Sequence, residues 1–281
     1  MAHAVTVIPP PILLPGGVLV HCVPAHEDNL IWLIELPSGE AAVVDGPDAE
    51  AALNLCAARG LRLTTVLNTH THGDHIGVNR DLQKRGLLAA MRVVGPAGAA
   101  AAVPGLNEPV SEGDEITLGD TFRLHVWLTE GHMNGHISFI TPGAVFCGDT
   151  LFAGGCGYLF DGPPAKMLDS LTRLAALPED TLVFCAHEYT LDNLRFGAWV
   201  EPDNLDLRAR LTETTRTRAE GRCAVPSTIG LERATNPFMR AHSPTLKARL
   251  REELPDAPLH DALAVFTAAR ALKNTARHRA Y

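Results

Sequence analysis

Basic residues are absent from the first part of this chain, and aromatic residues make up only 5% of its 281 residues. The first lysine or arginine is Arg59, whereas a secretory signal needs a basic segment near the N-terminus and a transit peptide needs several arginines. Long apolar runs are missing too, because prolines interrupt residues 8–20 and Arg92 and Pro96 interrupt residues 87–103. We therefore expect a cytoplasmic protein with no targeting signal and no attachment to a membrane.

The six cysteines are scattered, with no close pair at the spacing of a zinc finger. In a reducing compartment such cysteines remain free thiols. Cys147, Cys156 and Cys185 lie near candidate site residues, but small buried hydrophobic groups are their ordinary role. No Gly-x-Ser-x-Gly sequence supplies a serine nucleophile. Any chemistry must therefore rest on other side chains.

The net charge of −8 gives no sign of a nucleic-acid-binding protein. Residues 1–190 contain 9 Lys and Arg against 21 Asp and Glu, whereas residues 191–281 contain 15 against 11. An acidic body joined to a basic segment suggests a site where the segment receives an anion, although a solvated basic helix surface explains the same charges.

Short apolar runs alternate with turn signals through the first two thirds of the chain, and each has the length and composition of a strand. These predicted strands are residues 19–23, 30–36, 41–44, 63–67, 92–94, 122–127, 138–140, 145–147 and 182–185. Helical patterns lie between some of them, at residues 48–59, 74–85 and 164–177. Many strands with few helices predict two sheets covered by helices.

The pattern changes after Tyr189, because residues 204–220, 244–252 and 260–276 all predict helices. The natural division is a first domain over residues 1–190 and a mainly helical second domain over residues 191–281.

The predicted strand 63–67 leads directly into the segment Thr69-His70-Thr71-His72-Gly73-Asp74-His75. Strand side chains alternate faces, so His70 and His72 can point the same way at the end of the strand. The following glycine permits a sharp turn, and Asp74 is a good opener for a helix. Four metal-competent side chains in six positions predict a metal site rather than a polar loop that happens to be rich in histidine.

Three further polar strings stand next to predicted strands. They are Gly131-His132-Met133-Asn134-Gly135-His136, Gly148-Asp149-Thr150 and His187-Glu188-Tyr189. Each is a weak signal alone, because a histidine beside a strand is more often a hydrogen-bonded structural residue. Together they supply the ligands that a site for two ions still needs.

The strings THTHGDH, GHMNGH, GDTLFAGGCG and AHEYTLDN, in this order and at these separations, resemble the metallo-β-lactamase superfamily. More narrowly they resemble glyoxalase II, the hydroxyacylglutathione hydrolases, over nearly the whole chain. The resemblance implies an α+β fold: a four-layered αββα sandwich followed by a helical C-terminal domain. It makes residues 1–190 the catalytic domain and residues 191–281 the substrate-binding domain.

The resemblance also implies two metal sites with a shared ligand. One ion would be bound by His70, His72 and His132, the other by Asp74, His75 and His187, and Asp149 would bridge both. We expect zinc, and iron or manganese also suits these ligands. Asp149 and Asp74 are expected to be catalytic as well, and His136 to have a supporting role.

The implied reaction is hydrolysis of S-2-hydroxyacylglutathione, such as S-lactoylglutathione, to glutathione and a 2-hydroxy acid such as lactate, a step of methylglyoxal detoxification. Glutathione carries two carboxylates, so its site should present cations and hydrogen-bond donors. The resemblance places Arg270, Lys273 and Tyr189 there, together with Tyr158 where relatives usually have Arg or Lys. A tyrosine donates one hydrogen bond but offers no positive charge, which leaves the identity of the thiol open.

Other functions remain open at this stage. The chain could hydrolyse a different thioester, or it could be a glutathione-persulfide dioxygenase of the same superfamily with a single iron bound by two His and one Asp. The complete second ligand set favours hydrolysis. A β-lactamase is disfavoured, because Asp149 stands where those enzymes typically use Cys, and a non-catalytic binding protein would have lost ligands. We expect a monomer that acts on a small-molecule glutathione thioester.

Overall fold

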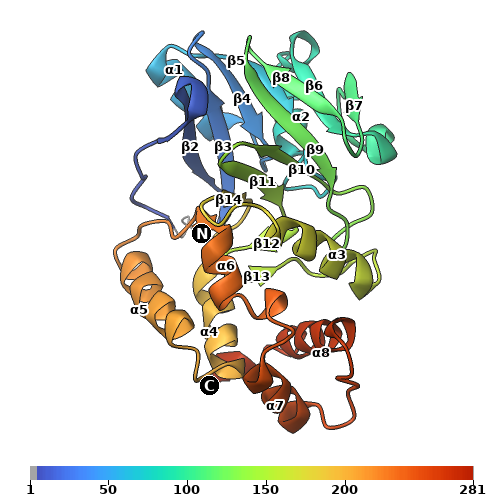
Figure 1. Cartoon of the computed structure of the whole chain (residues 1–281). Helices are drawn as coiled ribbons and strands as arrows, with labels where there is room; N and C mark the ends of the chain where they lie inside the picture. The colour runs from blue at the N-terminus through green and yellow to red at the C-terminus, as the bar shows by residue number, and fades with distance from the viewer. Residues whose placement is uncertain (1–4, 281) are drawn as a thin grey trace.

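The computed structural model describes residues 5–280, and its upper part consists of two β-sheets (Figure 1). The first sheet has the order β1-β2-β3-β4-β5-β6-β7, with strands Ile12–Leu14, Val18–Ala25, Asn29–Glu35, Glu40–Val44, Arg62–Leu67, Arg92–Pro96 and Glu108–Val110. The second has the order β15-β14-β11-β10-β9-β8, with strands Ser227–Thr228, Leu182–Cys185, Ala144–Gly148, Ile137–Thr141, Phe122–Leu128 and Glu115–Leu118. A separate hairpin pairs β12 (Leu151–Phe152) with β13 (Gly155–Cys156).

Strand β3 packs against a different core on each of its two faces. Its side chains alternate faces. Leu30, Trp32 and Ile34 pack into the core shared with the second sheet, whereas Ile31 and Leu33 pack into a second core with the helices on the outer face. Both faces of this strand are therefore buried, which is typical of a sheet covered on both sides.

Helices complete the outer layers. Helices α1 (Glu50–Arg59) and α2 (Gly77–Lys84) cover the first sheet, and α3 (Pro164–Ala175) buries Met167, Leu171 and Leu174 in the core of the second. The predicted α+β fold, a four-layered αββα sandwich with helices after it, is confirmed.

The lower part of Figure 1 is helical. It consists of α4 (Thr190–Val200), α5 (Leu205–Ala219), α6 (Ile229–Thr235), α7 (Pro244–Glu253) and α8 (Ala262–Asn274). This helical region, residues 190–280, also contributes to the sandwich, because β15 pairs antiparallel with β14 at the edge of the second sheet. The division of the chain at residue 190 stays a prediction.

All nine predicted strands are present, and the six predicted helices agree to within three residues at each end. Helix α4 was not predicted, because it buries residues such as Leu194, Phe196 and Trp199 on more than one side and so lacks a single polar face. Helix α6 and the short strands β1, β7, β8, β12, β13 and β15 were not predicted either.

The start of α2 corrects one expectation. Asp74 does not open the helix, which begins at Gly77, where an added Cβ would lie 2.0 Å from the carbonyl oxygen of Pro47. The intervening residues form a turn in which the backbone N–H groups of His75 and Ile76 both donate to His72 O. The carboxylate of Asp74 is therefore left free for contacts with other elements. Within residues 5–280, no helix combines the length and the apolar character needed to cross a membrane.

Candidate metal centre

The predicted ligands all follow strands at one end of the two sheets. His70, His72, Asp74 and His75 follow β5, His132 follows β9, Asp149 follows β11, and His187 follows β14. Strand β14 runs parallel to β11, so the ends of these two strands meet at the same edge. The fold brings together side chains that are more than 110 residues apart in the sequence.

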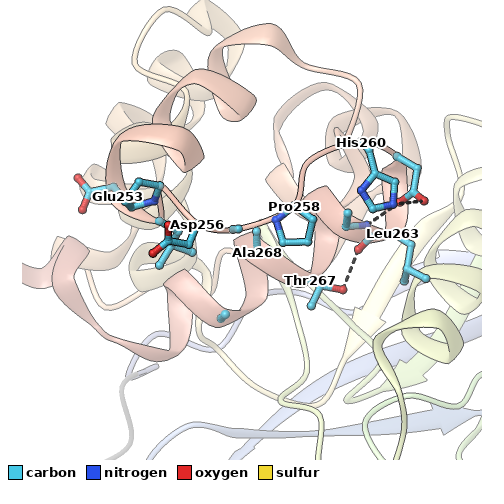
Figure 2. A pocket seen from close by; sticks show the side chains of 13 residues that line it. Glu253, Asp256, Pro258, His260, Leu263, Thr267 and Ala268 are labelled. Atoms are coloured by element: carbon cyan, nitrogen blue, oxygen red, sulfur yellow. Dashed lines mark hydrogen bonds and ion pairs between the residues drawn. The ribbon is translucent and has the colours of Figure 1, made fainter.

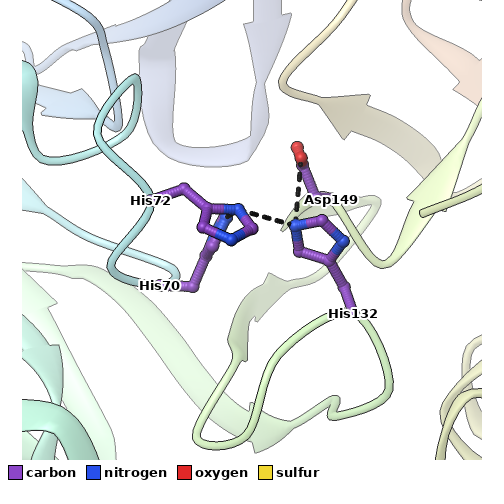
Figure 3. A group of neighbouring side chains, drawn as sticks. All are labelled: His70, His72, His132 and Asp149. Atoms are coloured by element: carbon purple, nitrogen blue, oxygen red, sulfur yellow. Dashed lines mark hydrogen bonds and ion pairs between the residues drawn. The ribbon is translucent and has the colours of Figure 1, made fainter. Parts of the chain in front are cut away.

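Three histidines and one aspartate form the first ligand group (Figure 3). Nδ1 of His72 lies 3.1 Å from Nε2 of His70 and 2.9 Å from Nε2 of His132. Nε2 of His132 lies 3.4 Å from Oδ2 of Asp149. The side chains converge from separate loops and could hold one ion.

The second ligand group consists of Asp74, His75 and His187. Oδ2 of Asp74 lies 3.7 Å from Nε2 of His75 and 3.4 Å from Nε2 of His187. The other carboxylate oxygen of Asp149, Oδ1, lies 3.4 Å from Nε2 of His75 and 3.5 Å from Nε2 of His187. Asp149 therefore has one oxygen facing each group.

Fixed acceptors orient the imidazoles. Nδ1 of His75 donates to Asp45 Oδ2 at 3.0 Å, and Nδ1 of His132 donates to the carbonyl oxygen of Tyr158 at 2.8 Å. Nδ1 of His187 donates in the same way to Asp28 Oδ1 at 2.8 Å. Because these acceptors require an N–H, the neutral imidazole of each residue carries its lone pair on Nε2, directed at the centre.

His70 is oriented by Thr69, which is itself hydrogen-bonded to Asp45. Thr69 Oγ1 donates to Asp45 Oδ2 at 2.6 Å, so it accepts from Nδ1 of His70 at 3.0 Å. His136 supports the centre without joining a ligand group: its Nε2 accepts from the backbone N of Asp149 at 3.2 Å, and its ring stacks on His70 at 4.7 Å. The roles of Asp45 and Thr69 were not predicted from the sequence. Asp45 follows a predicted strand, as several of the ligands do, and that pattern could have found it.

The centre has the electrostatics of a cation site. Burial lowers the pKa of His75, but the nearby carboxylates of Asp149 and Asp45 raise it well above its ordinary value. Burial likewise opposes the shift of His187, whose pKa the carboxylates of Asp149, Asp28 and Asp74 raise to about 9. The pKa of Asp149 is held well below its usual range by the surrounding imidazoles, although burial acts the other way.

Of the four buried side-chain atoms that lack a hydrogen bond within residues 5–280, two belong to this centre and the other two are Thr190 Oγ1 and His278 Nδ1. The two atoms at the centre are Nε2 of His75 and Oδ1 of Asp149, and they face each other at 3.4 Å. Buried polar atoms in folded proteins almost always have a partner. A lone pair facing a carboxylate oxygen is satisfied when a cation lies between them, so these residues fit a bound metal ion.

Two tyrosines lie beside the centre. The ring of Tyr189 stacks on His187 with a centroid distance of 4.8 Å and an interplanar angle of 5°. The half-exposed ring of Tyr158 packs against Phe160, whose ring lies 5.1 Å from that of His72. Phe160 therefore lies against the first ligand group and Tyr189 against the second.

Arg270 and Lys273 lie on the inner face of α8 rather than on a solvated surface. Arg270 is 8% exposed and Lys273 is 9% exposed. Arg270 Nη1 donates to Cys156 O at 3.0 Å, and Lys273 Nζ donates to Asp192 Oδ2 at 2.6 Å. Burial lowers the pKa of Lys273 to about 8, although its pairing with Asp192 opposes this shift. An ordinary exposed helix face does not describe these two cations.

An apolar hollow of about 520 Å³ lies elsewhere, between α8 and the loop 254–261 that joins α7 to it (Figure 2). Its lining includes Leu254, Pro258, Leu263 and Ala268. None of the residues of the two ligand groups lines it, so this hollow is separate from the centre. Cys147, a buried thiol whose pKa is raised by burial, is likewise not part of either ligand group.

Comparisons with known proteins define first a superfamily and then a family. Residues 27–187, more than half of the chain, match the family model described as "Metallo-beta-lactamase superfamily". Residues 188–276 match the model described as "Hydroxyacylglutathione hydrolase C-terminus".

Curated relatives narrow the class. A protein named hydroxyacylglutathione hydrolase from a Synechococcus species is 45% identical over 246 residues, covering 84% of this chain and 94% of that protein. A protein of the same name from Pseudomonas syringae is 45% identical over 262 residues, covering 91% of this chain and 98% of that protein. The chain belongs to the hydroxyacylglutathione hydrolase family, as predicted.

Solved structures share the fold. The crystal structure of ETHE1 from Myxococcus xanthus is similar with a TM-score of 0.59 and 25% identity, covering 95% of this chain and 99% of that one. The crystal structure of TTHA1623 in a di-iron-bound form is similar with a TM-score of 0.50 and 26% identity, covering 81% and 98%.

Proposed function

We propose that this chain is a two-metal thioester hydrolase that cleaves S-2-hydroxyacylglutathione, such as S-lactoylglutathione, into glutathione and a 2-hydroxy acid. The observation that carries the proposal is the position of Asp149, whose two oxygens lie within 3.5 Å of imidazoles from both ligand groups. Two ligand sets joined by one carboxylate are what a pair of ions requires. The name of the curated relatives supports the substrate class.

The proposed ligands are the residues of the two groups. His70, His72 and His132 would hold one ion, Asp74, His75 and His187 the other, and Asp149 both. The unpartnered atoms of His75 and Asp149 support this assignment. Nitrogen and carboxylate donors without a thiolate suit zinc, which we propose for both sites, and they also accept iron or manganese.

When bound, the two ions supply a hydroxide near neutral pH and polarise the thioester carbonyl. Two carboxylates are proposed to be catalytic. The buried carboxylate of Asp149 orients the attacking oxygen from between the two groups. The side chain of Asp74 is 42% exposed and accepts from Asn29 Nδ2 at 3.1 Å, so it is the carboxylate of the centre that reaches solvent. The thiolate of glutathione leaves without a strong acid, so no other side chain has to donate a proton.

We propose that residues 191–281 form a substrate-binding domain and that Tyr158, Tyr189, Arg270 and Lys273 bind the glutathione portion. Tyr158 and Tyr189 lie beside the centre, and the two cations lie on α8, where Arg270 donates to Cys156 O and Lys273 donates to Asp192. Lys273 is already paired with Asp192, so a glutathione carboxylate has to share that ammonium.

The decisive experiment measures metal content and thiol release together on the purified full chain. We expect about two ions per chain, as the two ligand groups require, and rapid release of a free thiol from S-lactoylglutathione. Turnover of other thioesters alone would retain the hydrolase and exclude glutathione as the thiol. One iron per chain with oxygen uptake on glutathione persulfide would instead establish the dioxygenase.

We further propose that the enzyme is a cytoplasmic monomer. The six cysteines are free thiols, and five of them are buried, which fits a reducing compartment. Light scattering on a size-exclusion column tests the monomer, and fractionation of the cells that express the chain tests the compartment.

A further inference from the structure

The β12–β13 hairpin connects two parts of the metal centre. It runs from Asp149, which faces both ligand groups, to Tyr158, whose carbonyl oxygen accepts from Nδ1 of His132. At the base of the hairpin, Gly157 N donates to Thr150 O at 3.3 Å, and a Cβ on Gly157 would lie 2.1 Å from the carbonyl oxygen of Asp149. The position of the hairpin therefore sets both the shared carboxylate and the orientation of one imidazole.

The helical region holds this hairpin by its backbone. Three side chains bond consecutive hairpin residues: Glu232 accepts from Gly154 N at 2.8 Å, Asn236 donates to Gly155 O at 2.9 Å, and Arg270 donates to Cys156 O at 3.0 Å. Gly154 has a φ of +72°, and a Cβ there would lie 2.8 Å from a methyl carbon of Leu194. The tip of the hairpin is thus held closely against α4 and α6.

Glu232 organises these contacts from a fully buried position, with 0% of its surface exposed. Oε2 accepts from Gly154 N and from Asn236 Nδ2 at 2.9 Å. Oε1 accepts from Arg210 Nη2 at 2.6 Å and from the hydroxyl of Ser227. A buried ion pair adds little net stability compared with well-packed apolar groups, but its carboxylate fixes the directions of four donors.

We propose that Glu232 is a positioning residue: by holding the N–H of Gly154 it places the hairpin, and through the hairpin it places Asp149 and the carbonyl that orients His132. Its hydrogen-bond partners include none of the predicted ligands, so it acts only through the backbone. The kinetic consequence rests on the proposed hydrolase function, whereas the structural consequence does not.

The first test replaces the carboxylate without changing its size. Glu232→Gln turns one acceptor into an NH₂ group that faces donors. We expect kcat on S-lactoylglutathione to fall about 10- to 100-fold, the range for groups that orient metal ligands, with KM nearly unchanged. Glu232→Asp keeps the charge beside Arg210 but withdraws it from Gly154, and it should give a smaller loss of kcat. It also serves as the second variant if Glu232→Gln does not fold.

The matched control is Glu201→Gln. Glu201 is 1% exposed and forms an ion pair with Arg240 at 3.0 Å within the same helical region, with no hydrogen bond to the hairpin. The substitution removes the charge of a comparably buried carboxylate. We expect kcat and KM to stay at wild-type values even where the melting temperature falls.

The second readout does not require activity. Hydrogen exchange of residues 150–158 in the metal-free protein should be at least about tenfold faster in Glu232→Gln, as expected for the loss of a hydrogen bond to a charged acceptor. Glu201→Gln should exchange at the wild-type rate. The proposal is overturned if both variants behave alike in exchange and kcat, or if Glu232→Gln changes KM alone. A wild-type chain that ignores S-lactoylglutathione refutes the proposed function but leaves the exchange comparison valid.

Discussion

Buried charged side chains differ in their hydrogen bonding between the metal centre in the sandwich and helix α8 in the helical region. In the sandwich, Asp149 and His75 present buried atoms that lack any hydrogen bond in residues 5–280. In the helical region, Arg270 and Lys273 are equally inaccessible but are bonded to Cys156 O and to Asp192. Buried atoms without a hydrogen bond are stabilised when a ligand binds them. A cation that already has hydrogen-bond partners must exchange one of them to bind a ligand. The contrast is what the proposed function requires, with the reacting groups in the first region and cations that release a substrate after binding it in the second.

The largest expected effect comes from removing the shared carboxylate. Asp149→Ala should lower kcat more than about 100-fold, beyond the upper range for groups that only orient ligands, because both ligand groups lose a donor. Elemental analysis should also show the loss of much of the second ion. An active variant with two ions would contradict the assignment of Asp149.

The next largest effect is expected from Asp45, which orients His75 directly and His70 through Thr69. Asp45→Asn places an NH₂ group where Thr69 and His75 both donate, so at least one donor loses its acceptor. Steady-state kinetics should show kcat reduced about 10- to 100-fold. Asp48→Asn, which changes an aspartate that pairs with His26 near the surface, is the control and should keep wild-type rates.

A smaller effect is expected in the helical region. Lys273→Met removes an ammonium without shortening the side chain much, and KM for S-lactoylglutathione should rise about tenfold, as for the loss of one charge-assisted hydrogen bond. The value of kcat should change little, because the reacting atoms are elsewhere. Arg251→Met, at an exposed position of α7, should leave KM unchanged. A loss of kcat with constant KM would place Lys273 in the chemistry instead.

The smallest effect is one of pH. Burial holds the pKa of Lys273 at about 8, so KM should rise as the pH passes through 8 and the ammonium loses its proton. Lys273→Met should remove this dependence. The unfolded chain retains the ordinary value of 10.5, so it binds more protons than the folded chain between these two pH values. The contribution of Lys273 to stability should therefore increase with pH across that interval, and chemical denaturation at several pH values would measure it.

The candidate ligands, which the structure brings together, could be found in the sequence because each belongs to a local pattern: a polar residue shortly after an apolar strand. The nine predicted strands were equally visible, since most of them are buried runs of apolar residues. Helix α4 was invisible, because Phe196 and Trp199 leave no polar face for a periodicity to detect. The short strands β12 and β15, of two residues each, carry no pattern at all.

The position of Asp45 after a predicted strand was visible in the sequence, but the partners of the supporting residues were not. Asp45 and Thr69 act through hydrogen bonds between loops, and Glu232 acts on a glycine 78 residues earlier in the chain. Such contacts depend on how elements that are distant in the sequence pack together. No short segment of the sequence contains that information. The same holds for Lys273, whose partner Asp192 lies on another helix.

Strand β15 has a consequence for the way copies of this protein behave toward one another. Ser227 and Thr228 pair with Val183 and Leu182, and they occupy what would otherwise be the open edge of the second sheet. An open edge is a template onto which the strand of another molecule can add. A chain cut after residue 190 would expose that template while it keeps every predicted metal ligand. Self-association, rather than catalysis, would then determine how the truncated chain behaves in the cell.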